Sequence, residues 1–215
     1  MPMSELIIRR LGLCAYEPVW HAMQAFTQTR TADTADELWL LEHTPVYTLG
    51  LNAKPEHLRD AGDIPVVRCD RGGQVTYHGP GQVVVYCLLD LRRLGIGVKT
   101  LVQQLEQSVI DLLADYALIG ARQAGAPGVY VGDVKIAALG LRITRGASYH
   151  GLSLNVAMDL LPYARINPCG YEGLAVTQLK ATTPMAASDV VGEQLLTALQ
   201  RNLVGELARP IEDTY

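Results

Sequence analysis

Short apolar segments separated by turn residues recur along most of the chain, and this spacing constrains the fold more than any other feature. The segments ELWLLE, VYTLG, IPVVRCD, QVTYH and QVVVYCLLDL each have the length and composition of a strand. Helical periodicity is found in EPVWHAMQAFTQTR and in residues 98–118, which Gly120 follows as a stop, and in residues 189–207. Strands and helices do not alternate regularly. The pattern therefore predicts an α+β (mixed α/β) fold with mixed or antiparallel sheets flanked by helices, not a doubly wound sheet.

Further strands are expected between residues 128 and 160. GVYVGDVKIAALGLRIT predicts a hairpin with its turn at Gly132 and Asp133, and ASYHGLSLNVAMDL predicts one more strand. We find no internal repeat, low-complexity tract or linker-like run in the sequence. We therefore expect residues 1–215 to form a single domain with a loose tail at 209–215.

Composition and charge argue against several classes of function. The chain has 215 residues, 49% of them hydrophobic, and a net charge of −4, whereas a general nucleic-acid binder is normally basic. The charges in MPMSELIIRR leave no apolar run for an export signal, and no stretch approaches the ~20 apolar residues of a membrane span. These features predict a cytoplasmic protein that binds neither nucleic acid nor membrane.

The four cysteines are widely separated, and none forms a C-x-x-C pair, so we expect neither a structural zinc site nor a disulfide framework. Cys69 and Cys87 lie in strand-like apolar runs and are expected to be core thiols. Cys169 differs, because it lies in the polar, turn-rich segment NPCGYEG. An accessible thiol there is a candidate nucleophile, and a turn cysteine without a role is the alternative.

Lys135 is unusual in the strand that follows the predicted hairpin turn. Strand alternation places Lys135 and Ala137 on one face and Ile136 and Ala138 on the other. A lysine with small neighbours can point into a cleft, and desolvation lowers the pKa of a lysine so that it can act as a base. A lysine that simply faces solvent is the alternative, since most lysines do.

The segment RGGQVTYHGPG is rich in glycine and is flanked by polar side chains. Adjacent glycines let the backbone bend sharply and let a ligand approach closely, although an ordinary hairpin would also use them. The segment matches neither a phosphate loop nor a dinucleotide fingerprint. His150, expected at the edge of a strand, is a supporting candidate, and the remaining histidines have no metal-ligand spacing. We therefore predict no metal site.

Taken together, these segments resemble a known family. RGGQVTYHGPGQ, GDVKIAALGLRI, YHGLSLNV and RINPCGYEGLAVTQL occur in the order and spacing of the lipoyl(octanoyl) transferases, and LEHTPVYTLG fits the same family. The resemblance extends from about Leu40 to Leu179. It implies a fold similar to the catalytic domains of lipoate-protein and biotin-protein ligases.

The resemblance also implies a reaction. Members of this family move an octanoyl group from the thioester of octanoyl-acyl carrier protein to a lysine of a lipoyl domain. The implied acceptors are the lipoyl domains of 2-oxoacid dehydrogenase complexes and the glycine cleavage H protein. The implied chemistry uses an acyl-thioester intermediate and no ATP, metal or other cofactor, as one step of lipoate biosynthesis by protein lipoylation.

The family's functional residues can be carried over onto matching positions. The acyl-accepting nucleophile falls on Cys169, and its partner, which stabilises the thiolate and handles the amine proton, falls on Lys135. Ser153 stands where the resemblance leads us to expect alanine. The acyl-substrate contacts implied by the motifs are Arg71, Gly72, Gly73, Gln74, Val75, Thr76, Tyr77, His78, Ala138, Leu139, Gly140, Gly151, Leu152 and Ser153.

These contacts predict a narrow apolar slot for the acyl chain. Small residues leave the slot open, and burying eight carbons could contribute roughly 5 kcal/mol at about 0.8 kcal/mol per CH₂. Three alternatives stay open: an ATP-dependent ligase of similar fold, a non-catalytic module that binds lipoyl domains or acyl carriers, and a thioesterase.

Overall fold

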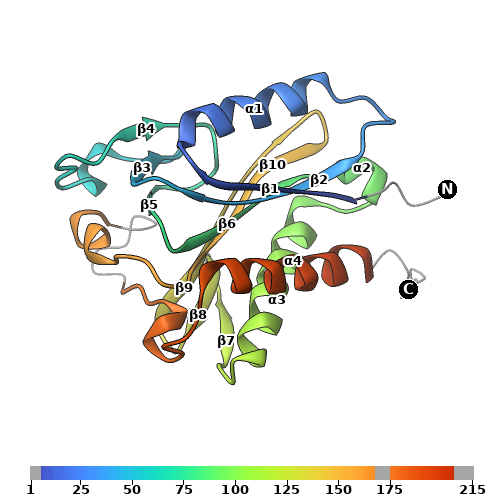
Figure 1. Ribbon diagram of the computed structural model, residues 1–215. Helices are drawn as coiled ribbons and strands as arrows, with labels where there is room; N and C mark the ends of the chain where they lie inside the picture. The colour runs from blue at the N-terminus through green and yellow to red at the C-terminus, as the bar shows by residue number, and fades with distance from the viewer. Residues whose placement is uncertain (1–5, 168–174, 206–215) are drawn as a thin grey trace.

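A mixed β-sheet lies at the centre of the computed structural model, which describes residues 6–167 and 175–205 (Figure 1). Within these residues the sheet has seven strands in the order β1-β2-β6-β10-β9-β8-β7. The first pair is parallel and the others are antiparallel. The strands are β1 (Leu6–Cys14), β2 (Asp36–His43), β6 (Gln82–Leu88), β7 (Gly120–Gln123), β8 (Ala126–Val131), β9 (Val134–Thr144) and β10 (Ala147–Asn155).

Helices cover both faces of this sheet. Helix α1 (Tyr16–Thr29) lies on one face, and α3 (Val98–Asp115) and α4 (Ser188–Gly205) lie on the other (Figure 1). The short helix α2 (Leu91–Leu94) leads into α3, and α4 follows the one-turn helix η4 (Leu179–Ala181). The mixed sheet and its helices confirm the predicted fold class.

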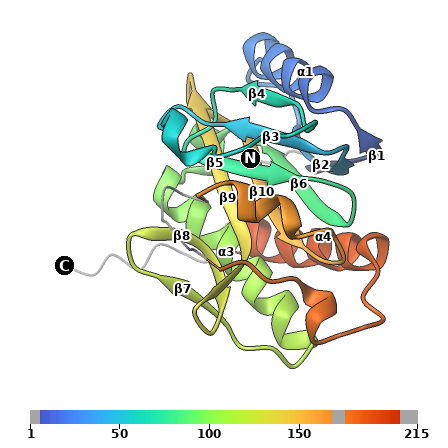
Figure 2. The ribbon, with the colours of Figure 1, turned by 90° about the vertical axis from the view of Figure 1, so that its left-hand side faces the viewer.

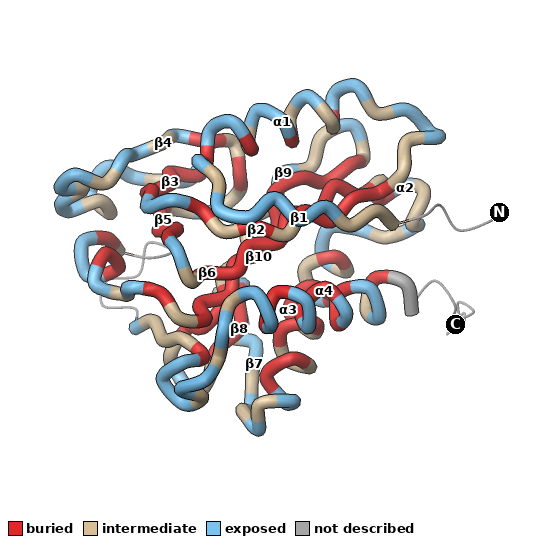
Figure 3. The backbone as a smooth tube through the Cα atoms, in the orientation of Figure 1, coloured by how far each residue is buried: buried red, intermediate tan, exposed pale blue. Residues whose placement is uncertain are grey.

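Strand β6 shows why the sheet needs cover on both sides. Val83, Val85 and Cys87 pack into the core beneath α3 and α4, whereas Val84 and Tyr86 pack toward α1. Successive side chains of a strand point to opposite faces, so an unbroken apolar run belongs in a strand buried on both sides. The red central strands of Figure 3 show this burial.

A second sheet of three strands packs beside the first (Figure 2). Its order is β4-β3-β5, with β3 (Val46–Leu49) between β4 (Val66–Arg68) and β5 (Val75–His78). The one-turn helix η1 (Pro55–His57) lies between β3 and β4, and η2 (Leu161–Arg165) packs against β5. The GPG turn therefore does not close a hairpin, because β5 and β6 belong to different sheets.

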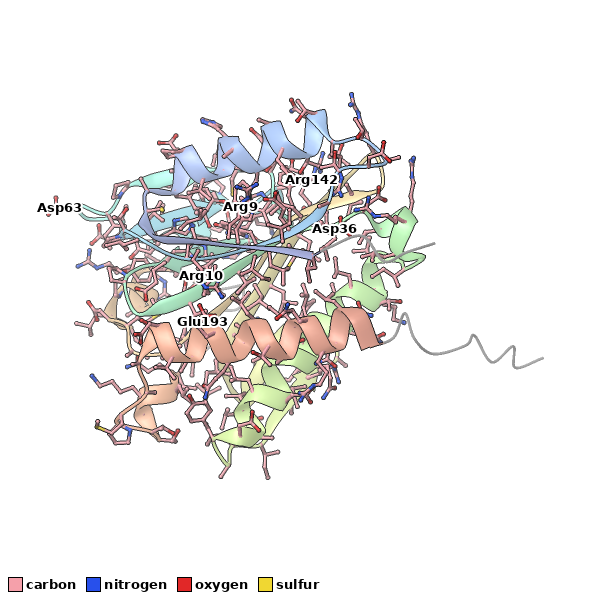
Figure 4. All side chains as sticks on the ribbon, turned by 45° about the vertical axis from the view of Figure 1, so that its right-hand side comes forward. Arg9, Arg10, Asp36, Asp63, Arg142 and Glu193 are labelled. Carbon is pink, nitrogen blue, oxygen red and sulfur yellow. The ribbon has the colours of Figure 1, made fainter. Side chains whose placement is uncertain are left out.

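Strand β1 was not predicted from the sequence, because its apolar residues are interrupted by consecutive arginines. It lies at the sheet edge, where charged residues are common. Arg9 Nη2 donates to Glu37 at 2.7 Å, and Arg10 donates to Glu193 of α4 at 2.6 and 2.8 Å. Figure 4 shows Arg10 and Glu193 pointing toward one another. Long-range ion pairs of this kind leave no local sequence signal.

Helix α3 ends earlier than its periodicity predicts. The chain turns at Ala117, which has a φ of 56°, and Leu118 N–H donates to Leu113 O at 2.9 Å while Ala117 N–H donates to Ala114 O at 2.9 Å. This pair of bonds is a Schellman motif. Gly120 is therefore not the stop but the first residue of β7.

The predicted hairpin turn and the two predicted core thiols are confirmed. The turn at Gly132 joins β8 to β9, which pair through Val131 and Val134. Cys69 and Cys87 are buried, as expected of core thiols. In the described part of the chain, no helix is both long enough and apolar enough to cross a membrane.

Candidate active site

A cavity of about 60 Å³ lies where the small sheet, β9, β10 and the start of α1 come together. The cavity brings together segments far apart in sequence, because Gly140 of β9 pairs with Gly151 of β10 and Gly72 N–H donates to Leu141 O at 2.9 Å. Its lining residues are Tyr16, Arg71, Gly73, Gln74, Val75, Thr76, His78, Val84, Tyr86, Ala138, Leu139, Gly140, His150, Gly151, Leu152 and Ser153.

All the acyl contacts implied by the motifs line this cavity except Gly72 and Tyr77. Gly72 adjoins the cavity wall, since its carbonyl oxygen lies 3.3 Å from where a Cβ on Gly140 would be. Tyr77 packs away from the cavity, with its ring 5.5 Å from Tyr47 and 5.7 Å from Tyr163. Strand alternation explains the difference between Tyr77 and its neighbour Thr76.

Arg71 shapes the glycine-rich loop from inside the protein. Its guanidinium donates to the carbonyl oxygens of Gly72 at 2.9 Å and Gln74 at 2.8 Å, and to the carbonyl oxygen of Thr48 at 2.6 Å. A Cβ on Gly50 would lie 2.9 Å from its Nη1, so glycine leaves the room this buried side chain needs. Arg71 therefore clamps the loop to β3 and brings a positive charge to the cavity wall.

Asp70, which sequence reasoning missed, anchors His150. The Asp70 carboxylate accepts hydrogen bonds from Trp20 at 2.8 Å, Gln24 at 3.0 Å and His150 Nε2 at 2.9 Å, and one from Tyr149. Burial opposes ionisation of Asp70, but these donors outweigh it and hold the pKa of Asp70 well below its usual range. The carboxylate thus ties helix α1 to strand β10.

The expectation that His150 lies at the edge of a strand is wrong. His150 is within β10, between β6 and β9, and the residue is 1% exposed. Its backbone has a φ of 59°, a region that few residues other than glycine adopt. Burial lowers the pKa of His150 despite the hydrogen bond to Asp70, so the ring is neutral near pH 7.

Two more histidines stand close to the cavity in neutral form. His43 Nδ1 donates to Cys14 O at 3.0 Å, so its Nε2 accepts from Tyr86 at 2.7 Å. His78 Nδ1 lies 2.7 Å from Gln82 Oε1. Burial lowers the pKa of His43 to about 4 and that of His78 to about 3.

Lys135 is buried, with 4% of its surface exposed, so the solvent-facing alternative is wrong. Its Nζ donates to Pro127 O at 3.0 Å and lies 5.1 Å from the centre of the Tyr130 ring. Gly128 makes this position available, since a Cβ there would lie 3.2 Å from Nζ and 2.7 Å from Ala137 O. A second, smaller cavity of about 10 Å³ adjoins Lys135 and shares Thr76 and Ala138 with the first.

Cys169 lies outside the described residues. On one side of that segment, Asn167 N–H donates to His57 O at 2.8 Å. On the other side, Lys135 N–H donates to Ala175 O at 3.1 Å, and Thr177 N–H donates to Lys135 O at 2.9 Å. The chain therefore resumes in direct contact with the backbone of Lys135.

Sequence reasoning missed several residues of this site. Tyr16, Val84 and Tyr86 line the cavity without belonging to any motif we used. The charge of Asp70, directly before the glycine-rich segment, was a usable signal. In the part of the chain that the structure describes, no group of three His, Cys, Asp or Glu side chains could hold a metal ion.

Comparison with known proteins places this fold in one class. Residues 15–200 match the family model described as the lipoyl protein ligase A/B catalytic domain. A lipoate-protein ligase A, solved with ATP bound, superposes with a TM-score of 0.73 at 14% identity, covering 94% of this chain and 85% of the ligase. The biotin protein ligase from Aquifex aeolicus superposes with a TM-score of 0.57 at 12% identity, over 96% of this chain and 73% of that one.

Relatives in sequence are much closer. An octanoyltransferase of Aromatoleum aromaticum is 62% identical over 201 residues, which are 92% of this chain and 86% of the relative. An octanoyltransferase of Laribacter hongkongensis is 58% identical over 207 residues, which are 96% of this chain and 98% of the relative. The chain therefore belongs to the octanoyltransferases of the lipoyl protein ligase A/B family.

Proposed function

We propose that this enzyme moves an octanoyl group from octanoyl-acyl carrier protein to a lysine of a lipoyl domain through a thioester on Cys169. One observation carries the proposal: a buried lysine lines a small cavity that shares Thr76 and Ala138 with a larger one, whose lining includes small and apolar residues. The segment containing Cys169 joins the described chain at Ala175, which is hydrogen-bonded to that lysine. This arrangement supports Cys169 and Lys135 as a working pair.

In the first half-reaction the Cys169 thiolate attacks the carbonyl carbon of the carrier's thioester. A C–S bond to Cys169 forms, and the C–S bond to the carrier breaks, so one thioester replaces another. The departing carrier thiolate takes a proton from the Lys135 ammonium, which leaves Lys135 neutral. Lys135 as ammonium stabilises the Cys169 thiolate by charge, the usual means of activating a cysteine.

In the second half-reaction the amine of the lipoyl-domain lysine attacks the acyl-enzyme. An amide bond forms, the bond to Cys169 breaks, and neutral Lys135 accepts the proton that the amine loses. Thioester exchange is nearly balanced in free energy, whereas conversion of a thioester to an amide runs downhill. Two half-reactions through a covalent intermediate predict ping-pong kinetics.

The cavity walls fit an unbranched acyl chain. Leu139 and Leu152 flank it, while Ala138, Gly140 and Gly151 keep it open. The acceptors we propose are lipoyl domains of 2-oxoacid dehydrogenase complexes and the glycine cleavage H protein. The acyl chain arrives already activated as a thioester, so the reaction needs no ATP.

Intact-mass measurement after mixing the enzyme with octanoyl-carrier tests the proposal. We expect a gain of one octanoyl group that Cys169→Ala abolishes, and transfer to a lipoyl domain without ATP. Lys135→Met should slow acylation on the order of 10²–10⁴-fold, as loss of an acid–base group does. An enzyme that acylates the lipoyl domain only when ATP is present would instead be a ligase. Loss of the acyl group to water rather than to the lipoyl domain would indicate a thioesterase.

A further inference from the structure

Glu106 is a buried carboxylate that neither lines the acyl cavity nor belongs to any of the sequence motifs. It is 5% exposed and lies on α3, which packs against β7 and β8 (Figure 1). Its Oε2 accepts from Arg122 Nε of β7 at 3.0 Å, and its Oε1 accepts from Gly128 N–H of β8 at 3.0 Å. An ion pair with Arg122 needs only the first of these oxygens. The second bond therefore holds one particular peptide group.

That peptide group links Glu106 to Lys135. Gly128 N–H and the Pro127 carbonyl belong to the same peptide, and the carbonyl oxygen accepts from Lys135 Nζ at 3.0 Å. The peptide is trans, so its N–H and C=O point in opposite directions. The carboxylate and the Lys135 nitrogen thus lie on opposite sides of one peptide group, within about 8 Å of each other.

The local backbone is shaped to bring Lys135 to this peptide. Gly128 has a φ of 137°, and a Cβ there would lie 2.7 Å from Ala137 O and 3.1 Å from Lys135 Cε. The pairing of β8 with β9 is irregular between Val129 and Tyr130, so β9 has an extra residue between Lys135 and Ala137. Such bulges redirect side chains and are common beside active sites. Glycine and bulge together let the lysine side chain lie back against the peptide.

The negative charge of Glu106 strengthens the bond that Lys135 makes. Hydrogen bonds in a chain polarise one another, so a carboxylate that accepts from the N–H makes the carbonyl oxygen of the same peptide a better acceptor. An ammonium donates more strongly than a neutral amine, so the better acceptor favours the charged form of Lys135. Direct attraction between the opposite charges acts in the same direction. Arg122 opposes it only in part, because its side chain is 40% exposed and solvent screens its charge.

Other titratable groups also border Lys135 within the described residues. The Tyr130 ring centre lies 5.1 Å from Nζ, and Tyr163 lines the same small cavity. Residues 175–177, which bond to the Lys135 backbone, have no titratable side chain. Asp133 is exposed at the turn before β9, where water screens its charge.

We propose that Glu106 is a positioning residue that holds Lys135 in its charged form through the Pro127–Gly128 peptide. Glu106 keeps its own charge throughout and exchanges no proton. In the reaction described above, the Lys135 ammonium stabilises the attacking thiolate and then protonates the departing carrier thiolate. Glu106 favours the form of Lys135 that both steps need. The catalytic part of this inference rests on the proposed function.

An NMR titration of Lys135 tests the proposal without any catalysis. The chain has four lysines, so protein labelled with 13Cε-lysine gives four signals, and Lys135→Met identifies the signal of Lys135. The amide of Glu106→Gln can still accept from Gly128 N–H, so the substitution removes mainly the charge. We expect it to lower the pH at which Lys135 is half protonated by roughly one unit. The other three lysine signals should titrate as in the wild type.

Arg122→Gln separates this role from a merely structural one. Both substitutions break the same ion pair, so both should lower the urea unfolding midpoint. Removing the positive charge of Arg122, however, should raise the pH at which Lys135 is half protonated by about 0.3–0.5 unit. Shifts in the same direction in the two variants would overturn the proposal. A shift of less than about 0.3 unit in Glu106→Gln would overturn it as well.

Glu42→Gln is the matched control. Glu42 Oε2 accepts from Gly81 N–H at 2.7 Å, and this peptide also joins a proline to a glycine. No lysine in the described part of the chain donates to the Pro80 carbonyl oxygen. This variant should leave the titration of Lys135 unchanged. A shift as large as that in Glu106→Gln would show a general effect of net charge and would count against the proposal.

Acylation rates at a series of alkaline pH values connect the titration to the reaction. Acylation of the enzyme by octanoyl-carrier should fall as Lys135 loses its proton, and Glu106→Gln should move this fall to lower pH by the same one unit, roughly. A shifted NMR titration with an unshifted rate profile would support the link between Glu106 and Lys135 and would contradict the proposed catalytic role of Lys135. An unshifted NMR titration would refute the link even in an enzyme that transfers octanoyl groups.

Discussion

At the residue scale, the buried charges and rings around the cavity do more than fill space. Arg71 has its guanidinium on backbone carbonyls and on the Thr48 hydroxyl, so the positive charge organises the loop that forms one wall. Asp70 holds His150 in one orientation and tautomer. Charged and polar groups with most of their hydrogen bonds already made are rigid, which suits a wall that must keep its shape when an acyl chain enters.

Gly140 gives the sharpest test of the slot. A Cβ there would lie 3.2 Å from Arg71 Cδ and 3.3 Å from Gly72 O, so an added methyl narrows the cavity with only a small shift of its neighbours. We expect Gly140→Ala to raise the ratio of six-carbon to eight-carbon transfer roughly tenfold, since each excluded CH₂ forfeits about 0.8 kcal/mol. Gly73 is less suitable, because its φ of 86° would strain any substituted residue.

Transfer rates from six-, eight- and ten-carbon carriers supply the measurement. Gly97→Ala is the control, since a Cβ at Gly97 meets nothing within 4 Å and the residue precedes α3. An unaltered chain-length profile in Gly140→Ala would place the acyl chain elsewhere.

At the element scale, periodicity located the strands and long helices but not their ends or partners. Helix α3 follows its apolar repeat until Asp115 and then stops at a Schellman motif whose left-handed residue is Ala117. An alanine in the sequence does not indicate a helix end of this kind, because glycine usually occupies the left-handed position of a Schellman motif. Strand β1 was missed for a related reason: its arginines find partners on β2 and α4, which local patterns do not encode.

Ala117→Gly should therefore stabilise the protein. A left-handed conformation costs an L-residue about 1–2 kcal/mol. Glycine avoids that cost but lowers the free energy of unfolding by roughly 0.4–1 kcal/mol, because it raises the conformational entropy of the unfolded chain. We expect a net gain of roughly 0.5–1 kcal/mol in the free energy of unfolding, or about 1–4 °C in Tm.

Urea and thermal unfolding would measure this gain. The matched substitution Ala114→Gly lies in the last turn of the same helix and should destabilise by about 1 kcal/mol. Equal losses in the two variants would show that the backbone at position 117 carries no strain.

At the scale of the whole molecule, burying neutral histidines makes stability depend on pH. The pKa of His43 is lowered to about 4 and that of His78 to about 3, and that of His150 is lowered as well. In the unfolded chain these groups take up protons near pH 6.5. The unfolded state therefore binds more protons below that pH, and the free energy of unfolding falls as pH falls from about 6.5 toward 4.

Below pH 6.5, each of these histidines should lower the free energy of unfolding by about 1.36 kcal/mol per pH unit. We therefore expect His43 and His78 together to lower the free energy of unfolding by about 2.5 kcal/mol when the pH falls from 7.5 to 5.5. Urea unfolding at a series of pH values would show this slope. His78→Gln should reduce it by one histidine's share, whereas the same change at His21, which is exposed on α1, should not. A pH-independent free energy of unfolding over this range would contradict the assignment of neutral buried rings.

The sequence by itself determined most of the strands, the long helices, the fold class and the family, because periodicity and motifs are local properties of the chain. It also selected most of the residues that line the cavity, from the segments RGGQVTYH, ALG and HGLS. Only the tertiary structure decided that Lys135 is buried, that Asp70 holds His150, and that Tyr16 lines the cavity. The physical reason is that burial and hydrogen bonding join residues far apart in sequence, such as Asp70 and His150, which are 80 positions apart. Their free energies arise only when the sheets and helices pack together.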